Sequence, residues 1–514
     1  MTMKARLDRS SEPPGGILLC KSETMMAWLC GIVLTLSVLL GGGTHAGFLG
    51  DVIVQLVSIP LLATSLWSFS SFDMNAQQRR GSLLFMCAVI IVFAIQLLPL
   101  PFQVPSIGGV LTARVSDLKM AGQDSSWTTI SATPQATWAA AASLIVPAAI
   151  FFGGIQLSLR HRLALAWLLL ALGGLSLALG FLQVAQGPAS SLRFYDVTNP
   201  QEAVGLFANR NHFAAHLYVT LVLAATWYAT TVHQTLRIGA LASRSMLWST
   251  AAAVSLVSVM AGLAMARSRA GVFLAMVALV GGILMVLRQQ NDRNDRSIRS
   301  HLTVGRMSML AVLFGLFFAV QLGLGSILTR FEGDPLEDLR VPFASTTFEV
   351  ALRSLPFGTG LGSFVPVYAA AEKDGDVFAG FANRAHNDLA EILLETGLLG
   401  LIILGAFLAW FFPAAYNVWL WRKFNGHDSQ LLLQRAATLV IFLLLGHSLV
   451  DYPLRTTALS SIFMFFCAVL AREASSPKDE LIPQRRQRSV DPKPPLGGNP
   501  GGKWGSDLQW PEGW

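Results

Sequence analysis

The chain has 514 residues, of which 53% are hydrophobic and 13% are charged. A soluble domain carries roughly 25% charged residues, so this composition excludes an ordinary soluble protein and predicts a membrane protein. The net charge of +7 would suggest a nucleic-acid partner for a soluble chain, but in a membrane protein the placement of basic loops accounts for it. The four cysteines, Cys20, Cys30, Cys87 and Cys467, occur singly and suggest neither a disulfide framework nor a metal site.

Long apolar stretches recur along most of the sequence. A membrane-crossing helix needs about 20 mainly apolar residues. We therefore predict an all-α polytopic membrane protein with about twelve transmembrane helices and a large periplasmic loop between helices nine and ten. The predicted spans are 25–43, 48–70, 82–101, 137–157, 163–185, 212–232, 248–266, 271–287, 307–328, 387–413, 431–449 and 456–471.

The basic residues predict the orientation in the membrane. Most of the 37 lysines and arginines fall in the leader at 1–24, in the tail at 472–514, and in loops on the same side as these termini. Because short basic loops remain in the cytoplasm, we expect both termini to be cytoplasmic and the loop at 329–386 to lie outside. The leader lacks a convincing cleavage site, so the first helix is expected to be retained. The Pro- and Gly-rich tail is expected to be a disordered cytoplasmic extension.

One polar segment, at about 339–400, lies between two apolar ones and ends in the sequence NRAHNDLAEILLETGLLG. His386 is a candidate base, because imidazole is the side chain whose unperturbed pKa lies near neutrality. Asp388, Glu391 and Glu395 follow at spacings of three and four, which places them on one face of the next helix. They would orient the imidazole or bind sugar hydroxyls. Equally, His386 and Asn387 would only cap the helix, with the acids favouring its positive end.

Arginines concentrate at the outer ends of predicted helices. Arg210 lies in GLFANRNHFAAHL, Arg267 and Arg269 lie in MARSRAG, and Arg340 lies with Arg353 and Arg384 in the polar segment that begins at about residue 339. The planar guanidinium suits bidentate contact with phosphate oxygens, and a lipid-linked diphosphate has its headgroup at this depth. Any single arginine is more simply explained by contact with ordinary phospholipid. The RSR turn places two arginines on the outer side, against the positive-inside trend. This favours a functional role for Arg267 and Arg269.

Two further motifs flank this segment. The glycines of LPFGTGLGSF (Gly358, Gly360, Gly362) follow no predicted strand, so we interpret them as a tight turn rather than a nucleotide loop. Asp451, in HSLVDYPLR, lies four residues from His447 and from Arg455. It is either a site residue or part of a local charge pair, and the charge pair is the favoured explanation for Arg455. The outer histidines form no metal-binding motif, so we predict no metal and no cofactor.

Taken in order, these segments carry a family resemblance. WTTIS, FANRNHFAAHL, SRAG, the loop arginine followed by LPFGTGLGSFVPVY, AHNDLAEILLETGLLG and HSLVDYPLR extend over residues 127–470. Over this range the chain resembles the O-antigen ligase and Wzy-type polymerase superfamily of bacterial membrane glycosyltransferases. The tail is not part of the shared pattern. An aromatic residue often follows the loop arginine closely in the family, whereas here the first are Phe343 and Phe348.

The resemblance implies a function and a location. Such proteins move a glycan from an undecaprenyl-diphosphate carrier to an acceptor hydroxyl at the periplasmic face of the bacterial inner membrane, without nucleotide sugar or metal. It implies that His386 is the base and that Arg210, Arg267 or Arg269, and Arg340 bind the diphosphate. The acceptor would be a glycan or glycolipid, and a flippase and a chain-length regulator are expected partners. The resemblance does not separate ligases from polymerases.

Two other classes of function fit twelve spans. A polysaccharide or lipid transporter would place polar groups near the bilayer midplane and in both halves of the chain, whereas here the ionisable groups crowd one side. A non-catalytic partner in polysaccharide export would retain no transfer activity. Glycan transfer from a purified lipid-linked donor, lost on replacing His386 with alanine, would discriminate between these classes and the enzyme.

Overall fold

The computed structural model describes residues 14–44, 47–101, 127–238, 243–291, 340–374, 382–421 and 429–472, together with 120, 122 and 377. The predicted span at 307–328 lies outside the described residues. So do the first part of the predicted leader, residues 329–339 of the predicted loop, and all but the first residue of the predicted tail.

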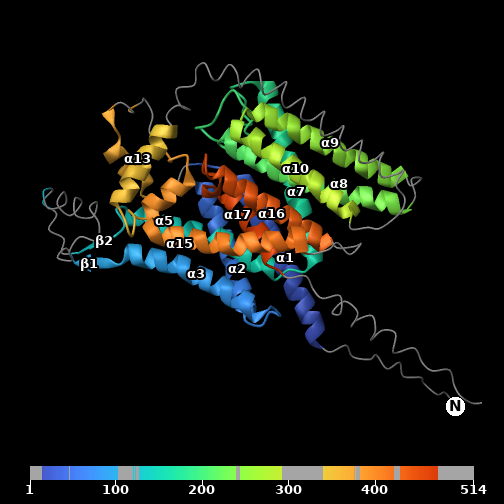
Figure 1. Cartoon of the computed structure of the whole chain (residues 1–514), viewed down its shortest axis with the longest axis horizontal. Coiled ribbons are helices and arrows are strands. Elements are labelled where there is room, and N and C mark those ends of the chain that lie inside the picture. The colour runs from blue at the N-terminus through green and yellow to red at the C-terminus, as the bar shows by residue number, and fades with distance from the viewer. Residues whose placement is uncertain are drawn as a thin grey trace, which may run out of the picture. The chain divides into compact units, whose positions relative to one another are not determined.

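The described chain is mostly helical (Figure 1). A two-stranded antiparallel sheet pairs Pro99 with Thr129, which the sequence did not predict. The elements are α1 (Pro14–Leu40), α2 (Leu49–Phe69), α3 (Ala76–Leu97), β1 (Pro99–Pro101), β2 (Trp127–Thr129), α5 (Pro134–Ser143), α6 (Ile145–Ile155), α7 (Leu159–Gln186), α8 (Arg210–Ile238), α9 (Ser243–Ala266), α10 (Arg269–Asn291), α13 (Arg340–Arg353), α14 (Phe364–Ala371), α15 (Asp388–Tyr416), the π-helix η2 (Asn417–Trp421), α16 (Ser429–His447), the 3₁₀ turn η3 (Pro453–Arg455) and α17 (Thr457–Ala471).

The predicted all-α polytopic membrane fold is confirmed. Within the described residues, nine helical segments are long and apolar enough to cross a membrane, and Val254–Ala266 and Thr457–Ala471 are shorter apolar helices. Every predicted span except 307–328 falls on one of them. The third was placed too late, because Asn75 caps α3 by accepting a hydrogen bond from the Gln77 amide (3.0 Å) and Pro99 follows its end.

Helix α8 is the centre of the bundle. It packs against α7, α9, α10 and α16, and Figure 1 shows it beside α9 and α10. Its core-facing side chains include Phe213, Leu217, Tyr218 and Leu221, all fully buried. Every residue of α8 from Arg210 to Ala225 is buried, so this part of the helix is surrounded by protein contacts.

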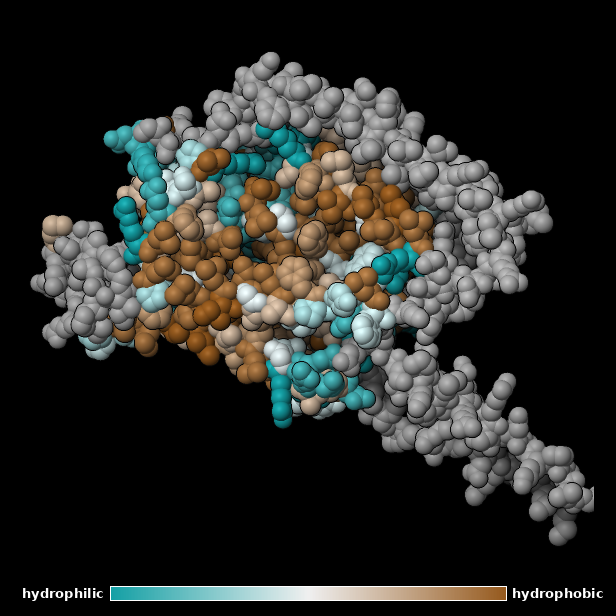
Figure 2. Space-filling view, in the orientation of Figure 1, coloured by the Kyte–Doolittle hydropathy of each residue, from teal (hydrophilic) through white to brown (hydrophobic). Residues whose placement is uncertain are grey.

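The outer helices carry apolar side chains on their exposed faces. Trp67 is 87% exposed, and Trp28 and Ile402 are also largely exposed. Figure 2 shows a broad apolar surface over α3 and α15, with hydrophilic side chains towards the ends. An apolar belt between polar ends is the surface that a bilayer requires.

Six helices begin, and five finish, at one end of the bundle, which we call the His386 end. Backbone hydrogen bonds join them there: Ala458 donates to Gly41, Ala208 to Gly42, Ala203 to Met265, and Asp388 to Ser448, at 2.8–3.2 Å. Helices α1, α3, α7, α9 and α16 finish at this end, and α2, α5, α8, α10, α15 and α17 begin there. The other end we call the opposite end.

Candidate active site at the His386 end

The backbone of His386 adopts a left-handed conformation immediately before α15, with φ of 51°. Asn387 caps the helix, since its side chain accepts a hydrogen bond from the Ala390 amide (3.1 Å). The capping role therefore belongs to Asn387. A non-glycine residue in this conformation costs about 1–2 kcal/mol and persists only where its surroundings hold it. His386 is held in this way by a specific set of contacts.

The imidazole of His386 bonds a carboxylate from another element. Its Nδ1 lies 3.0 Å from Oδ1 of Asp451, which follows α16. An ionised carboxylate only accepts hydrogen bonds, so Nδ1 carries the proton and Nε2 is the basic nitrogen. The His386 side chain is 17% exposed and that of Asp451 is 1% exposed. The acid that orients the imidazole is thus Asp451.

Asp451 is itself fixed by a second contact and by nearby charge. Its Oδ2 accepts a hydrogen bond from Nδ2 of Asn211 on α8 (2.7 Å). Burial alone would raise the pKa of Asp451. The hydrogen bond from His386 and the positive charges around it, including Arg340, outweigh burial and hold that pKa well below its usual range. Asp451 therefore remains ionised beside His386.

Tyr452 lies between two imidazoles. Its ring centroid is 5.1 Å from that of His386 and 4.9 Å from that of His212 on α8. Its hydroxyl accepts a hydrogen bond from Nδ2 of Asn383 (3.1 Å). Burial raises the pKa of Tyr452, and the charge of Asp451 raises it further. The phenol is therefore a neutral, fixed wall of the site.

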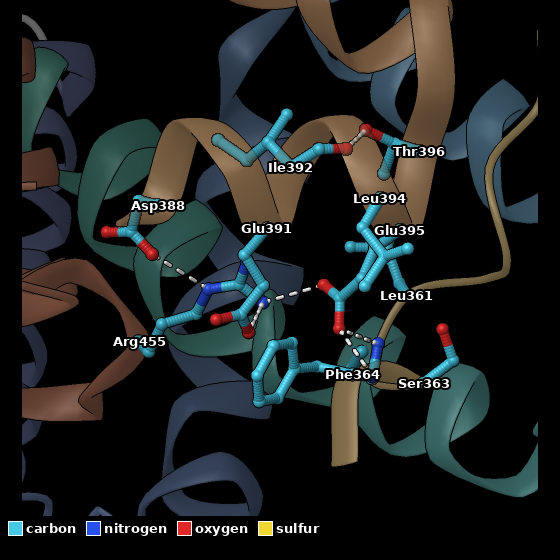
Figure 3. A network of polar contacts seen from close by, with 12 residues as sticks. Leu361, Ser363, Phe364, Asp388, Glu391, Ile392, Leu394, Glu395, Thr396 and Arg455 are labelled. Atoms are coloured by element: carbon cyan, nitrogen blue, oxygen red, sulfur yellow. Dashed lines mark hydrogen bonds and ion pairs between the residues drawn. The ribbon is translucent and has the colours of Figure 1, made fainter. Parts of the chain in front are cut away.

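Arg455 binds all three predicted carboxylates of α15 (Figure 3). Its Nε donates to Oδ1 of Asp388 (3.1 Å) and its Nη1 to Oε2 of Glu395 (2.8 Å). The same nitrogen lies 3.4 Å from Oε1 of Glu391. Burial opposes the charge of Arg455, but the three carboxylates raise its pKa well above the usual value. The prediction of a common face is correct, whereas the expected local charge pair for Arg455 is wrong.

Glu391 also holds the segment before His386. Its Oε1 accepts from Nη1 of Arg384 (2.8 Å), and its Oε2 accepts from the amide of Ala385 (3.1 Å). The Glu391 side chain is fully buried. Its two oxygens are satisfied by three donors, which is the condition under which a buried carboxylate is tolerated.

The glycine-rich segment forms the predicted tight turn. Gly358, Gly360 and Gly362 all have positive φ, and an added Cβ at Gly360 would lie 2.4 Å from Oγ of Ser131. Glu395 joins the turn to α15, because its Oε1 accepts from the amide of Gly362 (2.9 Å). Gln96 of α3 binds the turn on another side, accepting from the Leu361 amide (3.0 Å).

The predicted arginines occupy different surroundings. Nη1 of Arg210, the first residue of α8, donates to Oε1 of Glu202 (2.7 Å), and both side chains are largely buried. Arg267 is exposed with φ of 50°, and Arg269 begins α10. Arg340 begins α13 and acts electrostatically on Asp451. Of the four, Arg340 is related to the His386–Asp451 pair by its charge, which helps to lower the pKa of Asp451. Arg210 directly precedes Asn211, which donates a hydrogen bond to Asp451.

Several residues of the site were not predicted. Asn211 and Gln96 contribute contacts from α8 and α3, and Tyr452 does so from the position directly before η3. Asn211 lies in FANRNHFAAHL and Tyr452 lies in HSLVDYPLR. The sequence analysis selected both segments because of their charged residues and did not consider these two. Among the described residues, no group of three or more His, Cys, Asp or Glu side chains is arranged to hold a metal ion.

Comparison with known families gives one match. Residues 251–405 match the model of a family described as O-antigen ligase. The resemblance to the O-antigen ligase superfamily is thereby confirmed. The matched range begins in α9 and ends in α15, and it contains Arg267, Arg269, Arg340 and His386. No curated protein matches the chain. A multi-pass membrane protein with this domain is expected to act on glycans carried by lipids.

Proposed function

We propose that the protein is a glycosyltransferase that moves a glycan from an undecaprenyl-diphosphate carrier to an acceptor hydroxyl at the periplasmic face of the bacterial inner membrane. The main support is the His386–Asp451 pair, a basic nitrogen oriented by a buried carboxylate (3.0 Å) at an end of the bundle. The O-antigen ligase match over residues 251–405 supports the same class of reaction.

In the proposed reaction, His386 acts as the general base. Nε2 takes the proton of the acceptor hydroxyl while the hydroxyl oxygen forms a bond to the anomeric carbon of the donor sugar. The bond from that carbon to the diphosphate oxygen breaks, and undecaprenyl diphosphate leaves. Attack opposite to the leaving group inverts the anomeric configuration. Asp451 stabilises the imidazolium that forms, as a fixed anion hydrogen-bonded at Nδ1.

The leaving diphosphate carries charge that the site must neutralise. Arg340 begins α13, and its positive charge helps to lower the pKa of Asp451. We assign it as the first diphosphate ligand, with Arg210, Arg267 and Arg269 as further ligands. Guanidinium groups offer paired donors to phosphate oxygens without proton loss. Electrostatic stabilisation of this kind substitutes for a divalent cation, so we propose a metal-independent reaction.

The predicted orientation places this end in the periplasm and both termini in the cytoplasm. At the opposite end, Arg79 and Arg162 lie in the first turns of α3 and α7, and Arg472 directly follows α17. Arginines of short loops remain in the cytoplasm, which supports this orientation.

The test is glycan transfer by the purified protein, with undecaprenyl-diphosphate glycan as donor, EDTA present and candidate acceptors offered in turn. We expect transfer that survives chelation, with the product anomer opposite to that of the donor. Arg340→Ala is expected to raise the KM for the donor at least tenfold. Transfer to lipid A core would identify a ligase, and transfer to a second carrier-linked repeat a polymerase. Absence of transfer to every acceptor, or transfer abolished by EDTA, would contradict the proposal.

A further inference from the structure

The segment that presents His386 is fixed on both sides. After His386, the amide of Asp388 donates to the carbonyl of Ser448 (2.8 Å), and Asn387 caps α15. Before His386, the side chain of Arg384 and the amide of Ala385 both donate to Glu391. The left-handed residue therefore lies between two anchored stretches of backbone, and Glu391 provides the anchor on the N-terminal side.

Glu391 differs from the other two carboxylates of α15 in this respect. Glu395 accepts hydrogen bonds from Arg455 and from the amides of Gly362 and Phe364 in the glycine turn. Asp388 accepts from Arg455. Within the part of the chain that the structure describes, Glu391 is the one of the three that accepts hydrogen bonds from the residues directly before His386, one at each carboxylate oxygen. Its position one turn into α15 ties those residues to the rigid helix.

We propose that Glu391 is a positioning residue that holds Arg384 and Ala385 so that the left-handed backbone of His386 directs the imidazole onto Asp451. This inference rests on the proposed function, because it assigns Glu391 a role through the base of that reaction. Arg455 supports Glu391 by neutralising its charge at 3.4 Å. Loss of Glu391 would let the imidazole leave Asp451 without removing a group that touches the donor.

The test compares Glu391→Gln and Glu391→Asp with wild type in glycan transfer. The control is Glu349→Gln, which makes the same chemical change on α13, where Glu349 forms an exposed ion pair with Lys373 (3.1 Å). A small misplacement of a reacting group can lower the rate about 100-fold. We expect Glu391→Gln to lower kcat between about tenfold and 100-fold with the donor KM changed less than twofold, Glu391→Asp to recover part of the loss, and Glu349→Gln to resemble wild type.

A second readout does not depend on transfer. Diethyl pyrocarbonate acylates the unprotonated imidazole nitrogen, and mass spectrometry of the His386 peptide gives its rate of modification. We expect this rate to change at least threefold in Glu391→Gln and to remain unchanged in Glu349→Gln. If Glu391→Gln does not fold, Glu391→Asp provides both measurements.

The outcomes separate the two proposals. Normal kcat in a folded Glu391 variant, or a loss of kcat with unaltered His386 reactivity, overturns the positioning role while leaving the transferase in place. Absence of transfer by wild type overturns the proposed function. The modification rate of His386 then decides the positioning role alone: a change supports it and no change overturns it.

Discussion

The two ends of the bundle each hold a histidine paired with a carboxylate, and the pairs differ in what surrounds them. At the His386 end, Nδ1 of His386 lies 3.0 Å from Asp451. At the opposite end, Nδ1 of His161 lies 2.8 Å from Oε1 of Glu23. The two ends are far apart along α7. His161 precedes Gln183, which lies near the His386 end of this helix, by 22 residues, or about 33 Å.

The surroundings of the two pairs differ in ways that support the proposed catalytic role of the His386–Asp451 pair. Glu23 also accepts from the amide of Ser158 (2.7 Å), so the second pair joins α1 to the start of α7. Its side chains are 25% and 32% exposed, whereas that of Asp451 is 1% exposed. Asp451 is further fixed by Asn211, and His386 has a strained backbone. Strain and a buried, oriented partner are features that cluster at functional sites.

The arginines differ between the two ends in the same way. Arg455 binds three carboxylates. Arg472, at the opposite end, donates to the carbonyl of Asp73 (3.1 Å) and lies over the ring of Phe72 (4.6 Å). Carbonyls and rings are sufficient to anchor a helix end. Carboxylates cost more to bury and orient specific donors, so the buried carboxylates around Arg455 support a functional role for the His386 end.

Replacing Arg455 should lower the stability of the protein more than any other substitution considered for the two ends. Arg455→Ala leaves three buried carboxylates without their shared cation, and breaking a buried pair costs about 3–5 kcal/mol. We expect a large fall in the melting temperature of the purified protein. Arg472→Ala, which loses a carbonyl and a ring contact, should cost about 1 kcal/mol. Equal falls in the two variants would contradict the distinction between the ends.

Asp451→Asn should give an intermediate effect that depends on pH. The folded pKa of Asp451 is depressed below the ordinary value of about 3.9. Its stabilisation is therefore complete above about pH 4 and is lost as the pH falls through the folded pKa. We expect Asp451→Asn to lower stability by about 1.5–3 kcal/mol at pH 7, with the difference from wild type shrinking below about pH 4. Thermal melts across this range measure it, and a constant difference would be contrary to the account.

The smallest of the three effects concerns the glycine turn. Gly360 and Gly187 both have positive φ, at 102° and 83°. A Cβ at Gly360 would meet Ser131 at 2.4 Å, whereas nothing lies within 4 Å of one at Gly187. Both alanine variants incur backbone strain, and Gly360→Ala adds a packing clash of about 1–2 kcal/mol. We expect Gly360→Ala to melt at a lower temperature than Gly187→Ala, and the reverse order would contradict the close packing of the turn.

Much of the fold could be predicted from the sequence because the determinants are local. Apolar stretches locate the helices, and spacings of three and four place Asp388, Glu391 and Glu395 on one face. Positive φ at Gly358 follows from the tight turn that its glycine-rich segment predicted. The start of α3 was misjudged because its first turn, after Asn75, is polar.

The partners of these groups could not be predicted, since they come from distant parts of the chain. Arg455 follows Asp388 by 67 residues and Asp451 follows His386 by 65. Spacing within a helix carries no information about which other helix end lies opposite. Arg455 was assigned to its sequence neighbour Asp451 for this reason, whereas the fold brings it to α15 and gives Asp451 to His386.

The most direct test compares the two histidines in one transfer assay. Initial rates are measured for wild type, His386→Gln and His161→Gln, each purified and matched for melting temperature, with undecaprenyl-diphosphate glycan as donor. Loss of a general base lowers rates about 100-fold or more. The account predicts a loss of at least about 100-fold for His386→Gln and a rate within twofold of wild type for His161→Gln. Full activity of His386→Gln, or equal losses in both variants, would contradict it.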